Sequence, residues 1–306
     1  MPRIRGSLLM LLMVAGCAAT PAPESTAPSA PPATGTVQPT TTTTTTTTAP
    51  VATTTTPTTT TPSTTTTTLP EGVTPAPDWL GTRPVPTDED GTTLTLPTPP
   101  ELSDRRFVTV DHLPPPPDDL FHSTVGPLPP DVVARSTWSE DCPVALDDLS
   151  YLTVTFWGFD ERPHTGELVV SAAVAEDVIA VFAEIYEARF PIESIILTSS
   201  EDLEADPTGD TNVSASFVCR PATGGTGWSE HAFGQAIDIN PFHNPYRRGD
   251  VVLPEMASDY LDRDRDLPGM IHEGDAVVRA FDDIGWGWGG RWGSLDDWMH
   301  FSVSGN

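Results

Sequence analysis

The stretch SEHAFGQAIDIN, Ser229–Asn240, places a histidine and an aspartate seven positions apart with a glycine between them. Its AIDIN segment alternates polar and apolar residues, which is typical of a strand with one buried face. The two isoleucines then face the core, and Asp238 faces the opposite side. Seven fully extended residues span about 23 Å, so the chain must fold back if His231 and Asp238 are to bind one ion. Gly234 supplies the backbone freedom for that turn.

A second stretch with the same alternation, WMHFSV at 298–303, lies near the C-terminus. It predicts another strand that buries one face and projects His300 from the other. If the two strands are neighbours in the right register, Asp238 and His300 meet. The residues expected to face the core are Met299, Phe301 and Val303, and those expected to face outward are Trp298, His300 and Ser302.

Two histidines and one carboxylate are a common ligand set for catalytic zinc, with the fourth position left to water. Bound zinc lowers the pKa of that water to about 7. The candidate ligands are His231, Asp238 and His300. Asp297, three residues before His300, is the candidate general base for the water. Arg220 is the candidate cation for an oxyanion that develops during amide hydrolysis.

Each of these residues also has an ordinary explanation when it is taken alone. Asp238 can cap a turn, Asp297 can be a solvated neighbour of Asp296, and Arg220 can pair with one of many carboxylates. Spacing by itself leaves both interpretations open. The remaining histidines are interpreted as surface or core residues: His112, His122, His164, His243 and His272.

The pattern of elements predicts an α+β domain with helices packed on a mainly antiparallel sheet. Strands are expected at 151–159, 166–170, 194–199, 236–240 and 298–303. A helix is expected from 172 to Pro191 with Ser171 as its cap, and another at 275–286, which Gly285 stops. The polar segment 206–220 is expected to be a surface loop that leads to Arg220.

The charge of the chain restricts its partners. It carries 43 acidic residues against 15 basic ones, which are all arginine, and its net charge is −28. Residues 1–70 carry a net charge of +1, so all of the net negative charge follows residue 70. Like charges repel, so we expect neither nucleic acid nor an anionic membrane surface as a partner of the domain.

The N-terminal part is expected to be an export signal followed by a spacer. Residues 1–17 combine two arginines, a short apolar run and VAGC, which resembles the bacterial lipobox and implies a lipid on Cys17. An ordinary signal peptide with an incidental cysteine is the alternative. Residues 18–70 are rich in Thr and Pro and are expected to be an extended, disordered tether. Residues 71–120 are a Pro-rich linker or a domain edge, and 121–306 form the domain.

Two further cysteines follow Cys17. In an exported domain Cys142 and Cys219 are expected to form a disulfide, with two buried free thiols as the alternative. The bridge would close a loop of about 77 residues and stabilise the fold by roughly 4 kcal/mol in the loop-entropy picture.

The combined motifs are far more specific than any single residue. SEHAFGQAIDINPFHNPY, 229–246, together with DDWMHF, 296–301, resembles the zinc D-alanyl-D-alanine carboxypeptidase and L-alanyl-D-glutamate endopeptidase family. That family shares its fold with the hedgehog signalling domain. TNVSASFVCR, 211–220, is similar to the family segment that ends in a substrate-facing arginine, and TFWGFDERPHTGELVV, 155–170, looks like an entry strand of one bacterial branch. The likeness covers about 121–306, and its match at Arg220 is looser than the others.

The resemblance implies zinc on His231, Asp238 and His300, with Asp297 as general base. It implies hydrolysis of peptidoglycan stem peptides. The lipobox-like VAGC and the Thr/Pro-rich spacer predict that the enzyme is lipid-anchored to the outer face of the membrane and reaches into the cell wall. The alternative is an inactive zinc-binding module that binds the wall or a partner protein. The segment GWGWGGRWG, 285–293, either lines the cleft through Trp286, Trp288 and Trp292 or packs around the last strand.

Overall fold

The computed structural model describes residues 68–89, 91–222 and 227–305, which all belong to one compact unit. The expected signal segment, Cys17 and nearly all of the expected tether lie outside these residues. Within the described part, every helix is too short or too polar to span a bilayer. The elements are β1 Ser123–Gly126, α1 Pro130–Arg135, β2 Leu149–Trp157, β3 Pro163–Ser171, α2 Ala175–Glu187, β4 Ser194–Ile195, α3 Ser200–Glu204, β5 Val213–Ser214, β6 Ala236–Asp238, β7 Tyr246–Arg248, β8 Val251–Leu253, α4 Ala276–Asp283, β9 Gly287–Trp288, β10 Asp296–Asp297 and β11 His300–Ser302.

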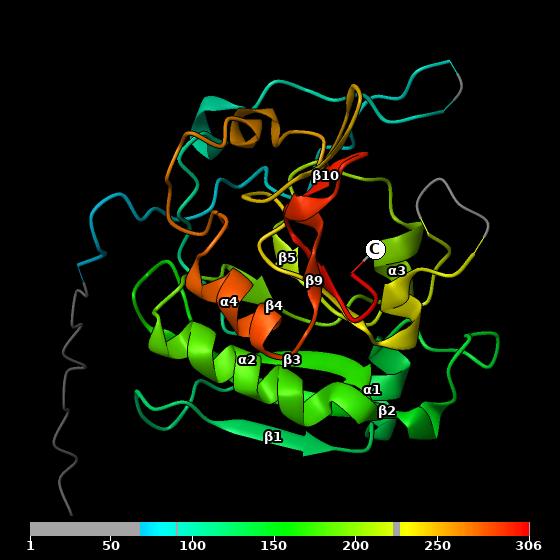
Figure 1. Ribbon diagram of the computed structural model, residues 1–306. Coiled ribbons are helices and arrows are strands. Elements are labelled where there is room, and N and C mark those ends of the chain that lie inside the picture. Colours follow the sequence, from blue (N-terminus) through cyan, green and yellow to red (C-terminus); the bar gives the residue numbers. More distant parts are fainter. Residues whose placement is uncertain (1–67, 90, 223–226, 306) are drawn as a thin grey trace, which may run out of the picture. The chain divides into compact units, whose positions relative to one another are not determined.

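The largest sheet contains β1, β2 and β3, which pair antiparallel in chain order. The segments at 151–159 and 166–170, both expected as strands, lie in β2 and β3 and pair with each other. Helix α2 packs against β2 and also against α4 (Figure 1). Together with the short β4–β5 pair, which is parallel, these elements give a mixed helix and mainly antiparallel architecture. This agrees with the predicted α+β class.

Helix α2 follows the predicted pattern at its start and buried face, but it ends early. The Ser171 side chain accepts a hydrogen bond from the backbone N–H of Ala173, and a 3-10 turn leads into the helix. Its last residue is Glu187, and Arg189 has a positive φ of 52°. A left-handed residue cannot continue a right-handed helix, so the helix stops before Pro191 is reached. The buried residues on its core face include Val178, Val181, Phe182 and Ile185.

Two three-stranded sheets carry the C-terminal motifs. One has the order β6–β11–β9 and the other β10–β7–β8, and both are antiparallel. Phe301 is buried as predicted. Val303, however, is 40% exposed, and Trp298 belongs to the main core. Strand β11 is only three residues long, so the alternation that the sequence predicts does not extend to the residues on either side.

The segment at 206–220 is not the surface loop that its polar composition predicts. Val213–Ser214 forms β5, and Ala215 bridges to Asp238. The buried Ser216 hydroxyl donates to the carbonyl of Val169 at 2.5 Å. Polar side chains are tolerated in a core when they find such hydrogen-bond partners. Buried residues of this segment include Asp210, Asn212, Ser214, Ser216, Phe217 and Val218.

The segment expected as a strand at 194–199 is also shorter than predicted. Only Ser194–Ile195 forms a strand. Ser199 instead caps α3, since its hydroxyl accepts from the N–H of Asp202 and the Asp202 carboxylate accepts from the N–H of Ser199. This reciprocal capping box competes with strand formation at the same residues.

The Pro-rich segment before β1 packs on the rest of the unit. Phe107 and Leu102 are buried in a cluster with Phe242 and Tyr260. Arg105 is also buried, where it donates to the Glu193 carboxylate in two hydrogen bonds and to a backbone carbonyl. These hydrogen bonds fix the segment to the rest of the unit. Removing one partner of a buried ion pair destabilises a fold because the other charge stays buried without a partner.

Candidate active site

Strands β6 and β11 bring Asp238 and His300 together. The two residues are direct partners in the antiparallel register. Directly opposite residues have their Cβ atoms about 5 Å apart. The Nδ1 atom of His300 lies 3.0 Å from Oδ1 of Asp238. The neighbouring strand register that the alternation pattern required is therefore present.

A tight turn brings His231 to the same place. Ser229 begins a 3-10 turn over Glu230–Phe233, with its hydroxyl accepting from the N–H of His231, and Gly234 ends the turn with φ 65°. A Cβ atom at Gly234 would lie 2.4 Å from the backbone nitrogen of Ser171, so both the backbone conformation and the space require glycine. The Nε2 atom of His231 then lies 3.2 Å from Oδ2 of Asp238.

The geometry and chemistry of this group fit a zinc ion. One donor atom from each of His231, Asp238 and His300 lies within 4.8 Å of the others. Donors of a tetrahedral zinc site are roughly 3.3 Å apart, as follows from zinc–nitrogen bonds of about 2.0 Å. The Nδ1 atom of His231 donates to the carbonyl of Ser216 at 2.5 Å. This hydrogen bond fixes the tautomer and leaves the lone pair of Nε2 for a metal.

The charges within the group reinforce one another. Burial alone would lower the pKa of His231, but the adjacent Asp238 carboxylate outweighs burial and holds that pKa above its usual value. Burial alone would raise the pKa of Asp238, but the two histidines hold it well below its usual range. The carboxylate therefore stays ionised, which is the state that binds a cation. Metal binding would release the proton that the raised pKa favours on His231.

Asp297 lies in the same cleft but outside the three-donor group. It is on β10, where it pairs with Tyr246 of β7. Its Oδ1 atom is buried and accepts no hydrogen bond from any described residue. Burial and the nearby Asp238 raise its pKa, and Arg220 opposes them. A buried carboxylate oxygen without a partner is rare, and here it is available to take a proton from a water molecule.

A close backbone approach positions Asp297. A Cβ atom added at Gly289 would lie 2.4 Å from the carbonyl oxygen of Asp297, so no larger residue fits there. This contact explains one glycine of the segment GWGWGGRWG. The tryptophans of the segment divide between the two interpretations: Trp286 and Trp288 belong to the core, whereas Trp292 lines the cleft beside the His300 ring.

Arg220 reaches the cleft from the end of a disulfide-anchored segment. Cys142 and Cys219 form the predicted disulfide, with their Cα atoms 5.8 Å apart. The backbone N–H of Cys219 also donates to the hydroxyl of Thr137 at 2.9 Å. Arg220 follows directly and lines the cleft. Burial and Asp238 raise the pKa of Asp297, and the charge of Arg220 partly opposes that rise, so Arg220 lies within electrostatic reach of the carboxyl.

The cleft that contains these residues has a volume of about 440 Å³. Its walls combine the three donors and Asp297 with aromatic and apolar side chains. Such a mixture is typical of binding sites for small molecules and peptides. The other lining residues are Arg220, Ala222, Trp228, Ser229, Glu230, Tyr246, Arg248, Leu253, Trp292, Leu295 and Met299.

Comparison with known families agrees with this geometry. Residues 223–303 match a family model described as D-alanyl-D-alanine carboxypeptidase. The match supports the resemblance of this segment to that peptidase family. The matched segment includes all three donors and Asp297, but it begins after Arg220. No curated protein and no solved structure matches the chain.

The histidines outside the three-donor group have other surroundings. His164 is buried between Asp111, 2.7 Å from its Nδ1, and Asp160, 2.9 Å from its Nε2. His243 is buried in the matched segment, and its Nε2 donates to the carbonyl of Arg105 at 2.9 Å. Burial lowers the pKa of His243 to about 4. The remaining exposed or half-buried histidines are His112, His122 and His272.

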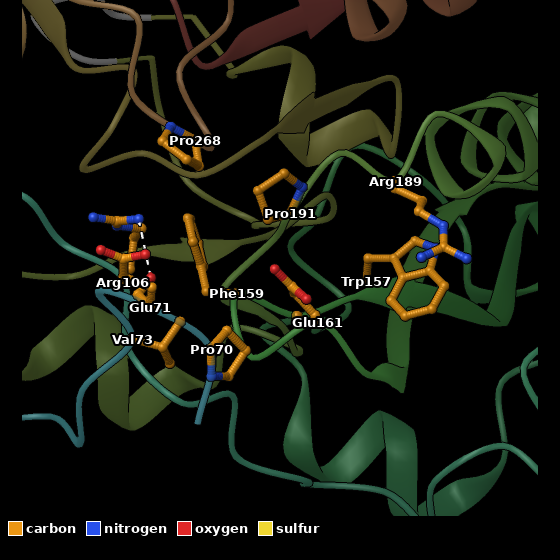
Figure 2. Close-up of a pocket in the computed structure, with 11 residues that line it drawn as sticks. Pro70, Glu71, Val73, Arg106, Trp157, Phe159, Glu161, Arg189, Pro191 and Pro268 are labelled. Atoms are coloured by element: carbon orange, nitrogen blue, oxygen red, sulfur yellow. Dashed lines mark hydrogen bonds between the residues drawn. The ribbon is translucent and has the colours of Figure 1, made fainter. Parts of the chain in front are cut away.

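A second pocket of about 390 Å³ lies apart from the candidate active-site cleft and shares none of its lining residues. Figure 2 shows the Arg189 guanidinium beside the Trp157 ring, and the guanidinium carbon lies 4.5 Å from the ring centre. The Phe159 ring stacks on His243. These rings are already in contact with other groups, so the pocket offers a ligand little free aromatic surface.

Sequence reasoning missed the residues that support the donors from the segment before Arg220. The carbonyl of Ser216 orients His231, and the Ser214 hydroxyl accepts from the N–H of Asn240 at 2.9 Å. Neither residue carries an unusual signal in the sequence. A short run of polar residues looks the same whether it faces solvent or a buried set of backbone groups.

Proposed function

We propose that this protein is a zinc peptidase that hydrolyses peptide bonds in peptidoglycan stem peptides. The observation that carries the proposal is the buried, unpartnered Oδ1 of Asp297 in the same cleft as His231, Asp238 and His300. A structural zinc site has no use for a free carboxylate beside its ligands. A hydrolytic site requires one, because the attacking water must lose a proton. The match of residues 223–303 to a carboxypeptidase family model also supports a peptidase function.

In this proposal His231, Asp238 and His300 hold the zinc. When bound, zinc supplies a Lewis acid and lowers the pKa of a water ligand to about 7. Asp297 accepts the proton of the attacking water and returns it to the leaving amine. The Arg220 guanidinium stabilises the negative charge that develops on the carbonyl oxygen. The Ser216 carbonyl keeps His231 in the tautomer that presents Nε2.

We further propose the hedgehog and D-alanyl-D-alanine peptidase type of fold for the domain. The antiparallel β6–β11 pair that carries Asp238 and His300 supports it, together with the turn that returns His231 to the same place. We also propose that a lipid on Cys17 and the Thr/Pro-rich spacer anchor the domain outside the membrane. The lipobox-like VAGC and the composition of residues 18–70 support that localisation.

Digestion of purified peptidoglycan fragments tests the proposed function. The zinc-loaded protein is incubated with muropeptides of defined stem length, and mass spectrometry identifies the products. Loss of one terminal D-alanine indicates a carboxypeptidase, and separation of L-alanine from D-glutamate indicates an endopeptidase. Intact muropeptides with a zinc-loaded, folded protein would overturn the proposal and favour the inactive zinc-binding module.

A further inference from the structure

We infer that Arg248 binds a carboxylate of the peptide substrate on the β7–β8 wall of the cleft. This inference rests on the proposed peptidase function and adds a recognition element to it. Residues of a strand alternate between its two faces. Tyr246 and Arg248 both line the cleft. Arg247 lies between them on the other face, where it pairs with Asp296 and lies over the Trp298 ring.

The acidic charge of the cleft indicates a role for Arg248 in binding an acidic substrate. Asp238, Asp297 and Glu230 line the same cleft, and the whole chain has a net charge of −28. A substrate that carries a carboxylate is repelled by such a surface unless cations offset it. The lining residues include two arginines, Arg220 and Arg248. Among the residues that the structure describes, Arg248 forms no ion pair, in contrast to its neighbour Arg247.

The two arginines of the cleft occupy different positions relative to Asp297. Arg220 lines the cleft together with Asp297 and lies within electrostatic reach of it. Arg248 lies further along β7, because Tyr246 is the residue opposite Asp297 and Arg248 comes two residues later. Two strand residues span about 6.6 Å, and an extended peptide advances roughly 3.3–3.6 Å per residue. Arg248 therefore meets a substrate group one or two residues from the reacting bond.

The chemistry of that group follows from the guanidinium. Arginine presents a planar fork of donors that matches a carboxylate with two parallel hydrogen bonds. Leu253, which pairs with Tyr246, and Met299 give the same wall an apolar part for the intervening substrate atoms. The carboxylate belongs either to the C-terminus of the peptide or to an acidic side chain next to the reacting bond.

The test compares peptides that differ in one carboxylate at a time. Three synthetic stem-like peptides are used: one with both carboxylates free, one with the C-terminus amidated and one with the acidic side chain amidated. In the zinc-loaded Arg248→Gln protein, KM for the fully acidic peptide should rise roughly 10- to 100-fold, the range for a lost charge-assisted hydrogen bond. The kcat value should change little. The amidated peptide that lacks the recognised carboxylate should show no such rise.

The matched control is Arg247→Gln, which removes the same charge from the adjacent residue on the other face of β7. This substitution should change KM for the acidic peptide and for the amidated peptides by the same factor. Arg248→Lys keeps the charge but loses the fork and should give an intermediate KM. An equal effect of Arg248→Gln on all three peptides would overturn the inference, since the loss would then be general.

Binding separates failure of this inference from failure of the proposed function. Calorimetry measures the affinity of each peptide for zinc-loaded Asp297→Asn protein, with and without Arg248→Gln. If the unmutated protein cleaves none of the peptides, the peptidase proposal fails, but a preference for the acidic peptide that disappears with Arg248→Gln still supports carboxylate binding. Equal affinity for all three peptides would refute it.

Discussion

Two clusters of histidine and aspartate in this protein have opposite arrangements. In the candidate metal centre, the Asp238 carboxylate lies between the rings of His231 and His300. In the other cluster, the ring of His164 lies between the carboxylates of Asp111 and Asp160. Both clusters are largely buried, and both join segments that are distant in the sequence. They use the same two residue types for different purposes.

The difference lies in where the lone pairs point. His231 and His300 direct nitrogen atoms toward one carboxylate, so three donors converge on one small volume. The two ring nitrogens of His164 point in opposite directions. Ionised carboxylates only accept hydrogen bonds, so both nitrogens of His164 must donate and neither keeps a lone pair for a metal. Convergent donors make a metal site, whereas divergent ones make a buried ion pair.

The largest expected effect is on zinc content. The His231→Ala protein should lose most of its zinc, because two donors do not replace a three-donor site. The His164→Gln protein should keep about one zinc per folded chain. Emission spectrometry after dialysis measures both proteins together with the unmutated one. Equal zinc loss in the two variants would break the distinction between the clusters.

The next effect sharpens the comparison by separating metal binding from catalysis. Asp297→Asn keeps the shape of the side chain but removes its basicity, so muropeptide cleavage should fall by about 10²- to 10⁴-fold. Zinc should remain near one per chain. Asp296→Asn is the matched control, because Asp296 pairs with Arg247 and does not line the cleft. Zinc loss in the Asp297 variant would make this residue a ligand, and unchanged cleavage would place the base elsewhere.

The His164 cluster should matter for stability instead. His164→Gln removes one of the two cations that pair with the buried Asp160 carboxylate, which keeps its pair with Arg162. The free energy of unfolding of the zinc-free protein should fall by about 1.5–3 kcal/mol, the scale for a lost hydrogen bond to a charged group. Chemical denaturation measures it. His122→Gln removes an exposed histidine from its pair with Asp118 and should leave stability near that of the unmutated protein.

The smallest effect is a pH dependence with a defined sign. Burial lowers the pKa of His164, but Asp160 and Asp111 outweigh burial and raise it above its usual value. The charged form therefore stabilises the fold fully below pH of about 6.5, the unfolded value. This contribution disappears as the pH rises through the folded pKa. The stability difference between the unmutated and His164→Gln proteins should shrink from pH 5 to pH 9, and a growing difference would contradict the assignment.

Much of the candidate active site could be predicted because its motifs are local. The glycine between His231 and Asp238 indicated a turn, and the structure has one with Gly234 at positive φ. Alternation in two short segments placed Asp238 and His300 on strand faces, but their register depends on the rest of the fold. The register had to be assumed from the sequence, and the structure supplies it.

Other features of the fold could not be predicted from the sequence, for physical reasons. A three-residue strand contains too few positions for alternation to predict its flanks, so Val303 and Trp298 were placed on the wrong faces. The serines of the segment before Arg220 looked solvent-exposed because composition does not reveal which backbone groups will satisfy them. The packing of Phe107 and Arg105 depends on contacts with residues more than 80 positions away.

The candidate metal donors and the facing wall of the cleft belong to two different small sheets, which has a practical consequence for altering this protein. Asp238 and His300 are carried by the β6–β11–β9 sheet, whereas Tyr246, Arg248 and Leu253 are carried by the β7–β8 hairpin of the other sheet. The tip of this hairpin is exposed at Gly249 and Asp250. Exchanging or lengthening such a tip is usually tolerated. A library of hairpin sequences would therefore be a direct route to changing which ligands the cleft accepts while the candidate zinc ligands stay untouched.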